Sequence, residues 1–203
     1  GVEYLYSENI VHGDLKGTNI LVTPSRRACI ADLGLSSIVS SMPILFTHST
    51  ASPQRGTMRW QAPEVLRGDS VNHFGSDIYA FACVCYEILS GKIPFYDLIE
   101  PAVMYQVTEK GARPERPVPW EGREVWKGVW RLVEECWKQE SETRPTAAEI
   151  VQRLIDLPQH EMDWDYTYTS KFRRSLQLLP SITQIERKVS VGGSFSFSKE
   201  YVL

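Results

Sequence analysis

Residues 12–19 have the sequence His12-Gly13-Asp14-Leu15-Lys16-Gly17-Thr18-Asn19, and two shorter motifs follow, Asp32-Leu33-Gly34 and Ala62-Pro63-Glu64. Two apolar runs joined by a Pro-containing turn separate the first motif from the second. A segment rich in Ser, Thr and Pro separates the second from the third. Any one of these motifs alone is typical of an ordinary turn. Their order and spacing together argue against chance, because their charged residues then fall in register with a hairpin and a loop between them.

The composition is that of an ordinary globular protein. The chain has 203 residues, a length typical of one domain or of one domain with a tail. Its net charge of −3 gives no electrostatic reason to expect nucleic acid or an anionic membrane as a partner. We expect no membrane span and no secretory signal. The four cysteines follow no zinc-ligand spacing, so we expect buried thiols and a cytoplasmic or nuclear location.

Apolar periodicity predicts a mainly α-helical domain with one small β-hairpin. Besides a short helix at the start of the chain, helices are expected from Ile78 to Leu89, from Val125 to Trp137, and after the capping box Thr146-Ala147-Ala148-Glu149. The first of these three is apolar on nearly every face, which is typical of a helix at the centre of a domain. Asp77 is expected to open it as an N-cap or first-turn acid, and Gly91 to end it.

The remaining sequence predicts the hairpin, one loop and a tail. The apolar runs at 19–22 and 28–31 flank a turn and predict the two strands of the hairpin. Residues 36–55 lack sustained periodicity and predict a mobile loop. After Pro158 the helical pattern weakens. We therefore expect a domain over residues 1–157 and a poorly ordered tail over residues 158–203.

The three motifs resemble the catalytic loop, the magnesium-binding triplet and the end of the activation segment of a protein kinase. The resemblance covers residues 1 to about 155 and implies the C-terminal lobe of the protein-kinase α+β fold. Lys16, two residues after Asp14, and Thr57 resemble kinases that phosphorylate Ser or Thr, whereas Ser76–Phe81 resembles the tyrosine-kinase-like branch. The resemblance therefore implies a tyrosine-kinase-like Ser/Thr kinase, a signalling transferase whose substrates are proteins.

The resemblance also implies a role for individual residues. Asp14 is expected to accept or orient the proton of the substrate hydroxyl, and Lys16 to neutralise charge on the transferred phosphoryl group. Asn19 and Asp32 are expected to hold Mg²⁺, because a hard cation prefers oxygen ligands. Leu21 is expected to form the apolar floor under the adenine. Lys16, Asn19, Leu21 and Asp32 are thus the residues expected to bind ATP and Mg²⁺.

Other residues of the pattern are expected to act through packing and pairing. His12 and Leu33 are expected to pack between the loop and the metal triplet. Glu64 is expected to form a buried ion pair with Arg144, and loss of either partner would cost roughly 3 to 5 kcal/mol. Gly13 occupies the position where the family commonly has an arginine that binds a phosphorylated activation loop, so we expect no switch of that type.

Two parts of the family's active site have no counterpart before His12, namely the glycine-rich phosphate loop and the strand lysine. We therefore expect weak Mg-ATP binding at best, no turnover by residues 1–203 alone, and pairing with an N-terminal lobe or a partner protein. Two interpretations stay open, a Ser/Thr kinase and an inactive, pseudokinase-like binding module. The run Val191–Ser196 is either part of a flexible tail or the start of a second, truncated kinase domain, since it faintly resembles a glycine-rich phosphate loop.

Overall fold

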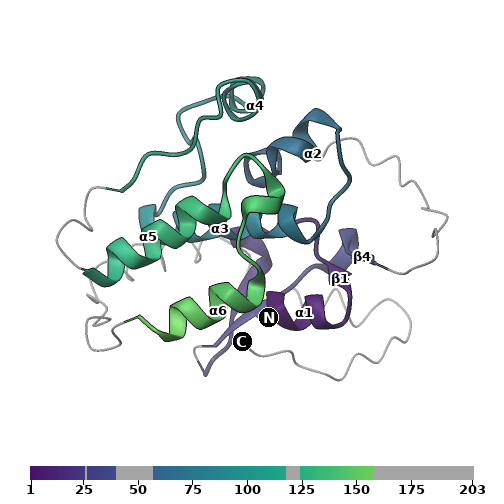
Figure 1. The fold of residues 1–203 in the computed structure, drawn as a ribbon, viewed down its shortest axis with the longest axis vertical. Coiled ribbons are helices and arrows are strands. Elements are labelled where there is room, and N and C mark those ends of the chain that lie inside the picture. The colour runs from purple at the N-terminus through teal and green to yellow at the C-terminus, as the bar shows by residue number, and fades with distance from the viewer. Residues whose placement is uncertain (26, 40–56, 118–123, 158–203) are drawn as a thin grey trace.

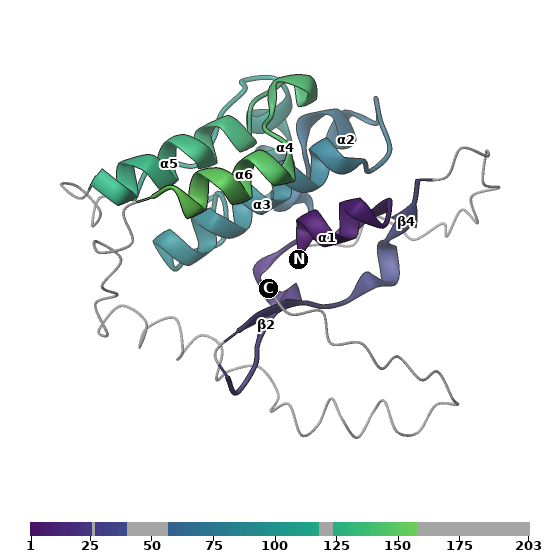
Figure 2. The ribbon, with the colours of Figure 1, turned by 60° about the horizontal axis from the view of Figure 1, so that its bottom comes forward.

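The computed structural model describes residues 1–25, 27–39, 57–117 and 124–157. Within these residues helices form the larger body, and a hairpin formed by residues 20–22 and 28–30 projects away from it (Figures 1 and 2). The helices are α1 (Val2–Ser7), α2 (Pro63–Arg67), α3 (Phe74–Ser90), α4 (Glu100–Thr108), α5 (Glu124–Cys136) and α6 (Ala147–Ile155). Single 3₁₀ turns are η1 (Gly17–Asn19), η2 (Leu33–Leu35), η3 (Met58–Trp60) and η5 (Ser141–Thr143). The mainly helical class with a small hairpin is confirmed.

Helix α3 is the central element of the helical body, as its apolar sequence predicts. Most of its side chains are buried, among them Ile78, Tyr79 and Cys83. The helix ends at Gly91, which takes the left-handed conformation with a φ of +68°. The N-cap is His73 and not Asp77, because the His73 ring and the hydroxyl of Ser76 form a reciprocal capping box. Asp77 lies in the first turn, as predicted, and its carboxylate is used elsewhere.

Helices α5 and α6 complete the hydrophobic core beside α3. The Trp130 and Trp137 rings meet edge to face, with centroids 5.5 Å apart, and both are buried. Thr146 caps α6 by accepting a hydrogen bond from the Glu149 backbone, and the Glu149 carboxylate accepts one from the Thr146 backbone in return. The predicted capping box is therefore confirmed. On the apolar face of α6, the Ile150 side chain is buried in the core.

The described residues also form two antiparallel strand pairs. Strands β2 (Ile20–Val22) and β3 (Ala28–Ile30) form the predicted hairpin, with Leu21 opposite Cys29. Strand β1 (Ile10–Val11) pairs with β4 (Ser37–Ile38). The second pair differs from the prediction of a loop over residues 36–55, because two residues of that segment gain backbone hydrogen bonds from a distant partner. The rest of that predicted loop, residues 40–56, lies outside the described residues.

Several apolar side chains remain exposed around the strands and η2. Leu33 exposes 45% of its surface, so its predicted packing role between the catalytic loop and the metal triplet is wrong in this chain. None of the three residues of the η2 turn that carries it is buried. None of the described helices is long and apolar enough to cross a membrane. The predicted tail at 158–203 lies outside the described residues.

Candidate active site

The loop that carries Asp14 is anchored on helix α3 through Asp77. One carboxylate oxygen of Asp77 accepts the backbone N–H of His12 at 2.7 Å, and the other accepts that of Gly13 at 2.9 Å. Burial raises the pKa of the Asp77 carboxyl, and these two backbone donors offset only part of that effect. Sequence reasoning missed this role. The available signal was a carboxylate on the buried face of an apolar helix, where it needs partners.

His12 connects the same loop to the segment before Asp32. Its Nδ1 accepts the backbone N–H of Asp14 at 3.2 Å, so Nε2 carries the ring proton and donates it to the Ala31 carbonyl at 3.1 Å. The His12 side chain is fully buried. The structure thus gives His12 the packing role that was predicted for it.

Asp14 is held through only one of its two carboxylate oxygens. Oδ2 accepts from Lys16 Nζ at 2.6 Å and from Asn19 Nδ2 at 3.3 Å, and Asn19 Nδ2 also donates to the Asp14 carbonyl at 2.9 Å. Oδ1 is buried and has no hydrogen-bond partner among the described residues. An ionised oxygen without a partner is costly to bury. Oδ1 is therefore the atom of this site that is ready to accept a proton or a hydrogen bond from a bound molecule.

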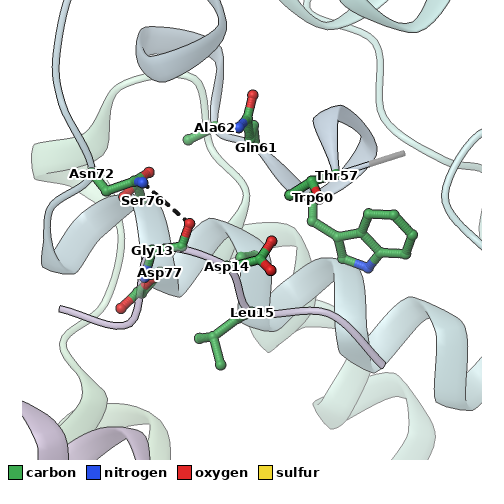
Figure 3. A pocket seen from close by; sticks show the side chains of 11 residues that line it. Gly13, Asp14, Leu15, Thr57, Trp60, Gln61, Ala62, Asn72, Ser76 and Asp77 are labelled. Carbon is green, nitrogen blue, oxygen red and sulfur yellow. Dashed lines mark hydrogen bonds between the residues drawn. The ribbon is translucent and has the colours of Figure 1, made fainter. Parts of the chain in front are cut away.

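A small cavity opens beside Asp14. Figure 3 shows the Asp14 carboxylate between Gly13 and Asn72 on one side and Thr57 and Trp60 on the other. The ammonium group of Lys16 also donates to the Thr57 hydroxyl at 3.3 Å. Lys16 therefore contacts both Asp14, two positions before it, and Thr57, 41 positions after it in the sequence.

Glu87, near the end of α3, is a second anchor that sequence reasoning missed. Its carboxylate accepts the backbone N–H of Gly17 at 2.9 Å and the indole N–H of Trp60 at 2.7 Å. Burial raises its pKa, and these two donors offset part of the rise. Glu87 thereby joins the loop that carries Asp14 to the 57–60 segment, which forms the other wall of the cavity.

The predicted magnesium ligands lie at the hairpin side of the site. Asn19 uses Nδ2 for both of its bonds to Asp14, which leaves its side-chain amide oxygen, Oδ1, for a cation. Asp32 follows Ala31, whose N–H donates to the Asn19 carbonyl at 2.8 Å, and its own side chain is exposed. Asp32 adopts the left-handed conformation with a φ of +63° and accepts from the Gly34 N–H at 3.3 Å.

These donors fit Mg²⁺ of the kind that completes its coordination with phosphate oxygens and water. Asn19 and Asp32 offer only hard oxygen atoms. Two such side chains leave the other positions of an octahedral shell to phosphate oxygens and water. The chemistry of the donor set therefore matches a cation that arrives with a phosphate ligand.

Leu21 lies outside the cavity. It is on strand β2 of the hairpin, where 43% of its surface is exposed, and the neighbouring Val22 is exposed as well. An exposed apolar side chain at this position offers a surface for a flat apolar ring. Its predicted role under the adenine stays a prediction.

The predicted pair of Glu64 and Arg144 is confirmed. The guanidinium of Arg144 donates to both carboxylate oxygens, at 2.7 and 2.8 Å, and the Arg144 side chain is 1% exposed. Burial raises the pKa of Glu64, but the hydrogen bonds and charge of Arg144 outweigh burial and place it below its ordinary value. The ion pair connects helix α2, which carries Glu64, to the turn before α6, which carries Arg144.

Comparisons with known proteins agree with this geometry. A family model described as protein tyrosine and serine/threonine kinase matches residues 1–154. The chain is 32% identical over 157 residues to serine/threonine-protein kinase STY17 of Arabidopsis thaliana, covering 77% of this chain and 25% of that protein. It is 36% identical over 154 residues to a probable serine/threonine-protein kinase of Dictyostelium discoideum, covering 76% of this chain and 11% of that protein.

A third relative is the human TGF-beta receptor type-1, 37% identical over 177 residues, which cover 75% of this chain and 34% of the receptor. The chain spans a quarter or less of the length of the two kinases named before it.

Proposed function

Because this chain belongs to the protein tyrosine and serine/threonine kinase family, we propose that its protein transfers the γ-phosphoryl group of ATP to serine and threonine hydroxyls of proteins. The observation that carries the proposal is the state of Asp14. Oδ2 is fixed by Lys16 and Asn19, whereas Oδ1 is buried, unpartnered among the described residues and next to the cavity. A substrate hydroxyl that reaches Oδ1 would give that oxygen its missing hydrogen bond.

Each residue of the site has a role in this proposal. Asp14 orients the substrate hydroxyl and accepts its proton, and Lys16, 2.6 Å from Asp14, supplies positive charge near the transferred group. Asn19 and Asp32 would hold Mg²⁺ from the hairpin side, and Leu21 would contact the adenine. Bound Mg-ATP supplies the phosphoryl group and neutralises charge on the phosphates.

Preference for Ser and Thr over Tyr is supported by the contact between Lys16 and Thr57. Their hydrogen bond of 3.3 Å places a lysine and a hydroxyl beside the base, the combination that suggested a Ser/Thr kinase in the sequence. The names of the curated relatives STY17 and the Dictyostelium protein also specify serine/threonine kinases.

The test is phosphate transfer by the full-length natural protein to a generic protein substrate, with wild type and Asp14→Asn compared side by side. Asn keeps the shape of Asp14 and removes the proton acceptor, so we expect transfer to fall by about 10²- to 10⁴-fold. The phosphorylated residues are identified by mass spectrometry. Transfer by Asp14→Asn at the wild-type rate would contradict the assignment of the base, and phosphotyrosine as the main product would contradict the proposed substrate class.

A second candidate function, a protein-binding module, is supported by the exposed apolar side chains near the hairpin. Leu21, Val22, Leu33 and Ile38 are all exposed within a short stretch of sequence. In this reading, the surface binds a further folded segment or a partner protein, and residues 1–203 transfer no phosphate. Measurement of Mg-ATP binding to the full-length natural protein by calorimetry, together with the transfer assay above, separates the two functions, since a kinase requires nucleotide binding and a binding module does not.

A further inference from the structure

The carbonyl group of Gly13 is bound by a side chain that the predicted kinase pattern does not include. Asn72, in the connection before α3, donates from Nδ2 to the Gly13 carbonyl oxygen at 3.1 Å. Figure 3 shows this bond at the wall of the cavity, beside Asp14. The N–H of Gly13 is bound from the other side by Asp77. Both polar groups of the residue preceding Asp14 are therefore held by side chains from outside the loop.

Gly13 and Asn72 also fit each other sterically. Gly13 has a φ of +77°, which is strained for residues with a side chain. A Cβ atom at this position would lie 3.0 Å from Asn72 Nδ2 and 3.1 Å from the Leu35 carbonyl oxygen. The amide of Asn72 thus occupies space beside the loop that a larger residue at position 13 would need.

The bond from Asn72 bears directly on the orientation of Asp14. The Gly13 carbonyl and the Asp14 N–H belong to one planar peptide unit. Asn72 binds the oxygen of that unit, and His12 Nδ1 binds its N–H at 3.2 Å. Fixing both ends prevents the peptide plane from rotating, and a rotation would redirect the Asp14 side chain.

We infer that Asn72 is a positioning residue for Asp14, acting through the Gly13 carbonyl. The inference rests on the proposed function in one respect, that Asp14 is the base. Asn72 acts on the direction of the carboxylate and lies away from the predicted Mg-ATP ligands. Its loss should therefore lower kcat and leave the KM for ATP unchanged.

The test compares Asn72→Asp and Asn72→Leu with wild type in the full-length natural protein. Asp keeps the size of Asn but, when ionised, cannot donate to a carbonyl. We expect kcat to fall by about 5- to 30-fold in both variants and the KM for ATP to stay within about twofold. Ser70→Ala is the matched control, because Ser70 donates to the Val71 carbonyl at 2.8 Å in the same segment without contacting the loop.

A pH series gives a readout that a merely structural role would not produce. Protonation restores a donor to Asp at position 72, so the ratio of Asn72→Asp activity to wild-type activity should rise as the pH falls from 7 toward 5, approaching the ordinary pKa of an aspartate, about 3.9. The neighbouring titratable groups, Asp14, His12 and Asp77, are present in both proteins and affect both. Asn72→Leu has no titratable group, and its ratio should stay flat.

Amide hydrogen exchange of residues 1–203, followed by NMR, tests the inference without any phosphate transfer. We expect faster exchange at Gly13 and Asp14 in Asn72→Leu and unchanged exchange in Ser70→Ala. Unchanged exchange at these two amides, or a wild-type kcat in both Asn72 variants, would overturn the inference. A wild-type protein that transfers no phosphate would instead overturn the proposed function, and the exchange result would still decide the role of Asn72.

Discussion

Breaking the ion pair between Glu64 and Arg144 is expected to remove a large part of the stability of this chain. The guanidinium of Arg144 makes five hydrogen bonds, two to Glu64 and one each to the backbone carbonyls of Gly75, Lys138 and Gln139. Replacing Arg144 with Met would leave three carbonyls without this donor and the Glu64 carboxylate with only His73 Nε2, 3.2 Å from one of its oxygens. A buried ion pair that loses one partner costs about 3 to 5 kcal/mol. Domains of this size have a total stability of about 5 to 15 kcal/mol.

The measurement is a double-mutant cycle on residues 1–203, with Glu64→Gln, Arg144→Met and the double variant unfolded in urea and followed by circular dichroism. We expect a cost of about 3 to 5 kcal/mol for Arg144→Met and a coupling energy of about 1.5 to 3 kcal/mol. The exposed pair of Arg153 and Glu135 is the matched control. Its N–O distance is 2.6 Å, but its side chains are 47% and 37% exposed, so Arg153→Met should cost less than about 1 kcal/mol.

The same cycle predicts the direction of a pH effect. The pKa of Glu64 is lower in the folded chain than in the unfolded chain. The contribution of the ion pair is therefore fully present above the ordinary pKa of a glutamate and is lost as the pH falls through the lowered folded value. The coupling energy should shrink in acid. A coupling energy at neutral pH no larger than that of the control pair, or one that grows in acid, would refute this reasoning.

Three further predictions concern the glycines at positions 13 and 91, the carboxylate of Asp77, and the thiols of Cys29 and Cys83. Gly91→Ala, at a φ of +68° with free space around it, should lower the free energy of unfolding in urea by about 1 to 2 kcal/mol, and Gly13→Ala by more because its Cβ meets other atoms; equal costs would contradict the close packing at Gly13. Asp77→Asn should cost about 1 to 3 kcal/mol in the same assay, because an amide has one acceptor oxygen for two backbone donors; a wild-type midpoint would show that these bonds do not matter. Iodoacetamide at pH 8 should modify Cys29 before Cys83, because Cys83 is buried and burial raises its pKa, and peptide mapping that finds Cys83 first would contradict the packing around α3.

Local signals in the sequence predicted the elements whose cause is local. The capping box of Thr146 and Glu149 starts α6, and Gly91 ends α3, because these residues satisfy backbone groups within one turn. The hairpin follows from two apolar runs and a turn. The pairing of β1 with β4 was not predictable in this way, since each strand has only two residues and their partners are distant in the sequence. Helix α4 was missed as well, because its apolar residues form no strong stripe.

The motifs predicted which residues meet in the site, but not what holds them there. Lys16 contacts both Asp14 and Thr57, and Glu64 pairs with Arg144 as predicted. The anchoring roles of Asp77, Glu87 and Asn72 depend on which backbone groups the fold brings to each side chain. Such contacts are made across some 60 to 70 positions of the sequence, so no local pattern indicates them. The prediction for Leu33 was wrong because the position of a residue in a motif does not determine how much of its side chain the rest of the fold buries.

The two carboxylates of α3, those of Asp77 and Glu87, must stay a fixed distance apart along the helix. Asp77 binds one end of the catalytic loop and Glu87 binds the other. They are ten positions apart, which corresponds to about 15 Å along the helix axis. Insertion or deletion of one residue between them would turn one carboxylate by about 100° relative to the other and shift it by about 1.5 Å. Related sequences should therefore vary in the length of their surface loops while α3 keeps its number of residues between these two acids.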